Sequence, residues 1–249
     1  MEILRAGAAL ADPLAPYAEV DRVRPGGGCW VLANMVGALD GSAAVDGRTR
    51  ALSTGSDSEL FVAMRALADV VLVGAETVRR EGYGPVRLPP ERVAARQAAG
   101  RAAVPRLAML TRSLDLDWSG KAFRVPAPDR PLVITCEAAD PARLAQARQV
   151  ADVLIAGVEL VDLEQALGRL ADLGHSVVLC EGGPRVLGEL VALGLLDELC
   201  LTIAPVMGGD PLPVAVTPAG APLRDFALRQ VLRAGDTLFL RYERGAAAR

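Results

Sequence analysis

The chain has 249 residues, of which 51 % are hydrophobic and 23 % are charged, and its formal net charge is −3. This length allows one sizeable core or two small domains, and the composition predicts a globular rather than a disordered chain. The basic residues are dispersed and no run of about 18 apolar residues occurs, so neither a nucleic acid nor a membrane is an expected partner.

The first part of the chain, residues 1–25, is predicted to be a peripheral arm, and residues 26–249 are predicted to form one domain. Within that domain six short apolar runs predict strands, at residues 29–36, 69–74, 105–111, 131–136, 152–157 and 176–182. Most of these runs are near-continuous Val, Leu and Ile, which is typical of parallel strands that are buried on both faces.

Helical patterns lie between the strands, and the clearest covers residues 162–175. Leu163, Ala166, Leu167 and Leu170 share one face at helical spacing. Asp162 and Gln165 resemble a capping box, and Gly174 supplies a stop signal. This alternation of strands and helices predicts an α/β fold with a mostly parallel central sheet and helices on both faces.

The C-terminal region has a different pattern. Residues 208–225 are rich in Gly and Pro and predict a long loop. Two extended runs flank Gly235 and Asp236, which predicts an antiparallel hairpin at the end of the chain.

The chain has no secretory signal pattern, since Glu2 comes early and no basic start precedes an apolar block. Its four cysteines, Cys29, Cys136, Cys180 and Cys200, lie in or beside apolar runs and are predicted to be buried free thiols. Both features favour the cytoplasm. No metal is expected, because His175 is the only histidine.

Two glycine turns follow predicted strands and precede predicted helices. The first is at Gly74, with a helix expected to start near Thr77, and the second is at Gly182 and Gly183, before Pro184. Helix N-termini present free N–H groups and a partial positive charge, which suit a phosphate. Neither turn is a GxGxxG or GxxxxGK[ST] motif, so ordinary Rossmann and P-loop sites are excluded. Together the two turns predict a site for a dinucleotide pyrophosphate.

Three stretches also carry a family resemblance: ANMVGALDGSAAVDGRTRALST, MRALADVVLVGAETVRREGYGPVRL and CEGGPRVLGELVALGLLDELCLTIAPVMGGD. In this order they resemble the reductase domain of riboflavin biosynthesis, over roughly residues 28–245. The resemblance implies a dihydrofolate-reductase-like fold and NADPH-dependent reduction of 5-amino-6-(5-phosphoribosylamino)uracil. The signatures of the zinc deaminase that precedes this domain in bifunctional enzymes, H-x-E and PCxxC, are absent.

The resemblance also implies site residues for NADPH. The nicotinamide is expected near Val36, Gly37 and Ala51, and the adenosine 2′-phosphate at Arg112 and Ser113. The pyrophosphate is expected at the two turns, over Gly74, Thr77, Gly182, Gly183, Pro184, Arg185, Val186 and Leu187.

For the small-molecule substrate the expected binding residues are Asn34, Thr49, Asp57, Arg65, Arg87 and Glu181. Arg65 and Arg87 are the candidate phosphate ligands, and Asp40 and Glu181 are the carboxylates nominated to orient the substrate or relay a proton. Each has a plain structural alternative. Asp40 suits a turn, Arg65 a solvated helix charge and Asp57 an ordinary N-cap, and the N-cap is favoured for Asp57.

The sequence departs from the family pattern at Ala38, where serine is usual, and at Asn34, where bacterial members carry lysine. Thr49 and Ala51 replace the serine and tryptophan of the typical loop. Two further functions therefore stay open. One is a dihydrofolate or other pterin reductase that uses Asp57, and the other is a non-catalytic NADPH-binding protein.

A homodimer is also expected. The family is generally dimeric, and Leu238, Leu240 and Tyr242 alternate on one face of the predicted hairpin.

Overall fold

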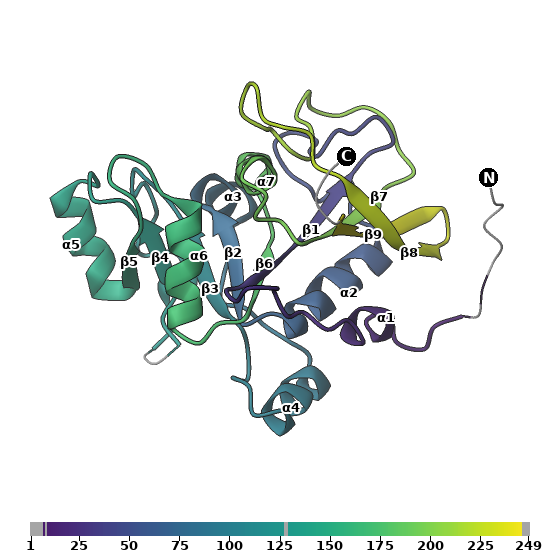
Figure 1. Cartoon of the computed structure of the whole chain (residues 1–249), viewed down its shortest axis with the longest axis horizontal. Helices are drawn as coiled ribbons and strands as arrows, with labels where there is room; N and C mark the ends of the chain where they lie inside the picture. Colours follow the sequence, from purple (N-terminus) through teal and green to yellow (C-terminus); the bar gives the residue numbers. More distant parts are fainter. Residues whose placement is uncertain (1–6, 8, 127–128, 246–249) are drawn as a thin grey trace.

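The computed structural model describes residues 7, 9–126 and 129–245 of the chain. The other residues of the predicted N-terminal arm and of the C-terminus lie outside the described residues. A single mixed sheet runs through the molecule, with the C-terminal hairpin at one end and β5 and α5 at the other (Figure 1).

In the part of the chain that the structure describes, the sheet has nine strands in the order β5-β4-β3-β2-β6-β1-β7-β9-β8. All six predicted strands are present within two residues of their expected ends, as β1 (Trp30–Gly37), β2 (Val70–Gly74), β3 (Arg106–Leu110), β4 (Leu132–Thr135), β5 (Asp152–Ile155) and β6 (Val177–Cys180). They pair in parallel with one another, and every residue of β2 is buried. The expectation of doubly covered parallel strands is thus confirmed.

One strand was missed by the sequence pattern, namely β7 (Glu198–Ile203). It pairs in parallel with β1 and antiparallel with β9, so it joins the parallel region to the hairpin. Its polar residues Glu198 and Thr202 interrupt the apolar run, yet both are buried. A prediction that looks for continuous apolar runs does not recognise a central strand that contains buried polar side chains.

Helices cover both faces of the sheet. One core includes side chains of α2 (Gly55–Met64) and α3 (Ala75–Glu81), and the opposite core includes α6 (Leu163–Asp172) and α7 (Pro184–Ala192). The remaining helical segments are α1 (Ala15–Ala18), η1 (Arg65–Leu67), α4 (Pro90–Ala98), η2 (Lys121–Phe123) and α5 (Pro141–Val150).

Helix α6 follows its predicted pattern closely. All four residues of the expected apolar face are buried. Asp162 is the N-cap, and its side chain accepts a hydrogen bond from the Gln165 N–H at 2.9 Å. The return half of the capping box is absent, because Gln165 Oε1 accepts from the N–H of Gly157 at 3.2 Å instead. The cap therefore also fixes the loop between β5 and α6.

The C-terminal hairpin consists of β8 (Phe226–Ala234) and β9 (Thr237–Arg244), joined at Gly235 and Asp236 as predicted. A loop without helix or strand precedes it, between residues 204 and 225. On β9, Leu238 is exposed and Leu240 and Tyr242 are partly buried, while Phe239 and Arg241 between them are buried. The homodimer stays a prediction.

Two other sequence features are also visible. All four cysteines are free and buried. Among the described residues, no helix is long and apolar enough to cross a membrane.

The N-terminal arm, where it is described, packs against the domain. Leu14 and Tyr17 are buried in the core that contains α2. Arg22 then donates from Nε and Nη2 to the two carboxylate oxygens of Glu198, at 2.9 and 2.8 Å. The Glu198 side chain has no exposed surface. The arm thus supplies the main charge partner of a buried strand residue.

We expect Arg22→Ala to lower the free energy of unfolding by about 3 kcal/mol, because it leaves the buried Glu198 charge without its bidentate partner. Chemical denaturation followed by circular dichroism measures the change. Arg229→Ala is the matched control, since Arg229 forms an exposed ion pair with Glu243 and is expected to lose less than about 1 kcal/mol. Equal losses in the two variants would contradict the assignment.

Candidate active site

A cavity of about 1580 Å³ lies beyond the carboxyl ends of the central parallel strands. Its walls include Val36 at the end of β1, Gly74 at the end of β2, Leu110 at the end of β3 and Glu181 just after β6. This is the edge of an open α/β sheet at which ligands bind. The volume exceeds the roughly 300–1,000 Å³ of an ordinary small-molecule site, so two ligands fit side by side.

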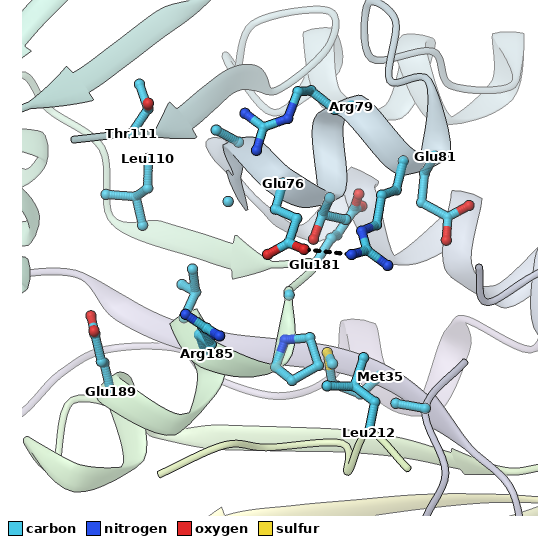
Figure 2. A pocket seen from close by; sticks show the side chains of 18 of the residues that line it. Met35, Glu76, Arg79, Glu81, Leu110, Thr111, Glu181, Arg185, Glu189 and Leu212 are labelled. Atoms are coloured by element: carbon cyan, nitrogen blue, oxygen red, sulfur yellow. Dashed lines mark ion pairs between the residues drawn. The ribbon is translucent and has the colours of Figure 1, made fainter. Parts of the chain in front are cut away.

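Figure 2 shows labelled side chains at two ends of the cavity. Leu110 and Thr111 lie at one end, across from Arg185 on α7, while Met35 and Leu212 lie at the other end. Glu181 is between them. Glu76 on α3 is held by an ion pair with Arg80, one helical turn later, at 2.8 Å.

The two predicted glycine turns lie against each other at the cavity wall. The Gly74 N–H donates to the carbonyl of Gly182 at 2.9 Å. Helix α3 begins at Ala75, two residues before the expected Thr77, and α7 begins at Pro184 with Gly183 as its N-cap. Neither helix has a side-chain cap, whereas α6, which also reaches the cavity, is capped by Asp162. The free N–H groups at the starts of α3 and α7 suit a pyrophosphate.

Close packing explains the glycines at these turns. A Cβ atom on Gly183 would lie 2.6 Å from Thr77 Oγ1, and one on Gly74 would lie 3.1 Å from a methyl group of Val186. Gly182 has φ +94°, in the left-handed region that favours glycine, and its peptide bond to Gly183 is cis. Side chains at these positions would separate the two helix starts.

The predicted 2′-phosphate residues, Arg112 and Ser113, are exposed and line the cavity directly after β3. Arg112 Nε donates to the carbonyl of Glu159 at 2.8 Å, which anchors the guanidinium. No described residue bonds to its two terminal nitrogens, which are the donors that a phosphate requires.

Glu181 is held by two side chains from distant parts of the chain. Arg65 donates from Nε to Oε1 at 2.6 Å and from Nη2 to Oε2 at 2.7 Å, and Tyr83 donates its hydroxyl to Oε2 at 2.8 Å. Glu181 is only 6 % exposed. The guanidinium of Arg65 lies 4.6 Å from the centre of the Phe61 ring. The carboxylate is therefore fixed in orientation by an ion pair, a phenol and an aromatic support.

Electrostatics keep Tyr83 and Arg65 protonated. Burial, followed by the charge of Glu181, raises the pKa of the Tyr83 phenol well above its usual value. Burial opposes the charge of Arg65, but its hydrogen bond to Glu181 and the Glu181 charge outweigh burial, so the pKa of Arg65 is raised. Both groups stay donors at neutral pH.

The arrangement defines what Glu181 can do. Each carboxylate oxygen accepts two hydrogen bonds. Oε2 is filled by Arg65 and Tyr83, while Oε1 has one remaining position. The Glu181 side chain has no exposed surface, so its carboxylate is suited to hold Arg65 and Tyr83 in place rather than to relay a proton.

Arg65 is not a solvated helix charge, since its side chain is 14 % exposed and pairs with Glu181. Its expected role as a phosphate ligand is also weakened, because two of its three nitrogens are committed to the carboxylate. Arg87 is exposed and does not line the cavity. Tyr83 was not identified from the sequence, although it lies four residues before Arg87, one of the expected substrate residues.

Asp57 is not the N-cap that the sequence favoured. Thr54 is the N-cap of α2, and its side chain accepts from the Asp57 N–H at 3.3 Å. The Asp57 side chain is buried and lines the cavity, as Asn34 and Thr49 do. The Thr49 hydroxyl donates to Glu81 Oε1 at 3.2 Å, which ties this loop to α3.

The structure does not bring every expected residue to the cavity wall. Asp40 is exposed, and N–H groups of Gly208 and Ser42 bond to its two oxygens. These bonds lower the pKa of Asp40 and match the turn alternative rather than catalysis. Five other expected residues also lie outside the wall, namely Gly37, Ala51, Arg65, Gly182 and Leu187. Gly37 packs against Val214, and Leu187 is buried in the core.

Comparisons with known proteins agree with this architecture. A family model described as the RibD C-terminal domain matches residues 29–238. A 2,5-diamino-6-ribosylamino-4(3H)-pyrimidinone 5′-phosphate reductase of Methanothermobacter thermautotrophicus is 30 % identical over 213 residues, which cover 84 % of this chain and 93 % of the relative.

Two solved structures extend the comparison. A pyrimidine reductase-like protein of Corynebacterium diphtheriae has a TM-score of 0.81 and 30 % identity, covering 95 % of this chain and 96 % of the other. A dihydrofolate reductase of Enterococcus faecalis, complexed with NADP(H), has a TM-score of 0.52 and 14 % identity, covering 87 % of this chain and 97 % of the other. The second likeness is one of fold, and it agrees with the expected dihydrofolate-reductase-like architecture.

Proposed function

We infer the function from one premise, which is that the chain belongs to the RibD C-terminal domain family. Its relatives are named as reductases, so the chain is an oxidoreductase of the riboflavin-pathway type, and a nicotinamide cofactor fits the family and the fold. We propose that it uses NADPH to reduce the ribosylamino side chain of a phosphoribosylaminopyrimidine to a ribitylamino group. The sequence favoured 5-amino-6-(5-phosphoribosylamino)uracil, whereas the relative is named for the 2,5-diaminopyrimidinone.

The observation that carries this proposal is the continuity of the cavity. At one end it offers two uncapped helix starts and Arg112, and at the other it offers the polar side chains of Asn34, Thr49 and Asp57. A dinucleotide needs the first group of contacts, and a hydroxyl-rich substrate needs the second. A reductase requires both ligands in one enclosed space.

The residues present fit the cofactor. Gly74 and Gly183 leave the helix starts bare, and Thr77, Arg185 and Val36 also line the cavity. Bound there, a reduced nicotinamide supplies a hydride to the carbon of a C=N bond in the ring-opened substrate. The protein's own residues align the ligands and exclude water. Glu181, whose side chain has no exposed surface, holds Arg65 and Tyr83 in place.

We expect Arg112→Ala to weaken NADPH binding on the order of a hundredfold and to leave NADH binding nearly unchanged, because only NADPH carries the 2′-phosphate. Titration of each cofactor by calorimetry measures the two affinities. Arg124→Ala, outside the cavity wall, is the control. If both cofactors bind less tightly, or neither does, Arg112 does not bind the 2′-phosphate.

The proposed function is tested by following NADPH oxidation by purified protein with the phosphoribosylaminouracil, the diaminopyrimidinone phosphate and dihydrofolate in parallel. Turnover of either pyrimidine with formation of a ribityl product supports the proposal. Turnover of dihydrofolate alone replaces it with a pterin reductase. Tight NADPH binding without turnover of any of the three replaces it with a non-catalytic binding protein.

A further inference from the structure

Asp57 is a buried carboxylate that the proposed function leaves without a partner. It lies in the first turn of α2, is 5 % exposed and lines the cavity. The N-cap position belongs to Thr54, so the Asp57 side chain is not used to cap the helix.

The hydrogen bonds of Asp57 are incomplete. Its Oδ2 accepts from the hydroxyl of Ser53, four residues earlier. No described residue donates to Oδ1, and no described Arg, Lys or His forms an ion pair with the carboxylate. Oδ1 is also absent from the fully buried atoms that lack a partner, so it is open to the cavity. Glu181, by contrast, has three donors and a paired cation.

Asp57 belongs to the substrate end of the cavity. Phe61 is one helical turn after it, on the same face of α2. Phe61 supports the guanidinium of Arg65, which in turn holds Glu181. Asp57 and Glu181 therefore approach the same part of the cavity from α2 and from the end of β6, away from Arg112 and Ser113 beyond β3.

A buried carboxylate is stable when donors surround it, so this site selects a ligand that supplies them. A 2-amino-4-oxopyrimidine presents two neighbouring donors, the ring N3–H and the 2-amino group. These match the two oxygens of a carboxylate in a bidentate pair. A uracil ring carries an oxygen in place of the 2-amino group. This oxygen is an acceptor, so it would face an acceptor oxygen of the carboxylate and no hydrogen bond would form there.

We propose that Asp57 is a specificity-determining residue that selects pyrimidines with an intact 2-amino group over their 2-oxo counterparts. The inference rests on the proposed function and deepens it. It implies that the substrate of the reduction is the diaminopyrimidinone. The deamination that removes the 2-amino group would then come after the reduction rather than before it.

The test compares kcat/KM for the 2-amino and 2-oxo phosphoribosylaminopyrimidines in the wild type and in Asp57→Asn. We expect the wild type to favour the 2-amino substrate about tenfold to a hundredfold, the size of one charged hydrogen-bonding pair. Asparagine both accepts and donates, which matches the N3–H and C2=O of uracil. Asp57→Asn should therefore bring the ratio to one or reverse it.

Two further variants keep the test decisive. Asp57→Ala should lose the preference without gaining the uracil, and Glu59→Gln, an exposed residue of the same helix, should keep the wild-type ratio. Calorimetric binding of the 2-amino and 2-oxo ribityl products gives the same comparison without turnover, and thermal melting confirms that each variant folds. A wild type that prefers the 2-oxo ring overturns the inference, as does a ratio unchanged in both Asp57 variants.

Failure of the inference is distinct from failure of the proposed function. If both pyrimidines are reduced at equal rates, the chain is a pyrimidine reductase and Asp57 does not select. If neither is reduced and dihydrofolate is, the function is wrong, although dihydrofolate carries the same 2-amino-4-oxo edge. If none of the three is reduced, product binding by the wild type and Asp57→Asn still reports the selection.

Discussion

Replacement of Glu181 by glutamine is expected to lower kcat/KM for the pyrimidine substrate by a factor on the order of a hundred or more. The amide cannot accept from both Arg65 nitrogens and from Tyr83 as the carboxylate does. The change also leaves the Arg65 charge, largely buried, without a counter-charge. The cluster is then expected to rearrange, and Tyr83, which lines the cavity, loses its fixed position.

Steady-state kinetics with the pyrimidine substrate measure this loss, and NADPH titration shows whether the cofactor end is intact. Glu137→Gln is the control, because Glu137 is exposed and outside the cavity wall. Tyr83→Phe removes one of the three bonds to Glu181 and is expected to lower kcat/KM about tenfold. Wild-type kinetics in Glu181→Gln would show that the cluster around Glu181 does not shape the substrate end of the cavity.

The parallel strands were predictable because burial on both faces leaves a local signature. In β2 every residue is apolar or glycine and every residue is buried. Strand β7 has no such signature, since Glu198 is stabilised by Arg22, 176 residues away in the sequence. A buried charge whose partner is distant resembles a surface residue in any local window.

In the candidate site, too, some features have a local sequence signature and others depend on distant residues. The helix starts after Gly74 and Gly183 follow from local turn rules, and both are present. The partners of Glu181 do not follow from local rules, because Arg65 and Tyr83 lie 116 and 98 residues away in the sequence. They meet Glu181 only when α2, α3 and β6 come together in the fold. Thr54 and Asp57 are both good capping residues within one turn, and local rules cannot show which one caps the helix and which one faces the cavity.

Substitution of Gly183 by alanine is expected to weaken NADPH binding by a factor on the order of a hundred, because it disturbs both helix starts at once. The new Cβ would lie 2.6 Å from Thr77 Oγ1, closer than real Cβ contacts allow. Since Thr77 belongs to the first turn of α3 and Gly183 is the N-cap of α7, relief of the contact moves one helix start away from the other. The N–H groups that face the pyrophosphate then no longer converge.

A double-mutant cycle tests this steric cause. Thr77→Ala removes the oxygen that the Cβ meets, so Gly183→Ala combined with Thr77→Ala should bind NADPH more tightly than Gly183→Ala alone. Gly168→Ala is the control, because a Cβ at this position in α6 meets nothing within 4 Å and alanine favours a helix. Calorimetric titration of NADPH gives the affinities. If removal of the Thr77 hydroxyl restores no affinity to the Gly183→Ala protein, then contact between the two turns does not govern cofactor binding, and the glycine is needed for its backbone alone.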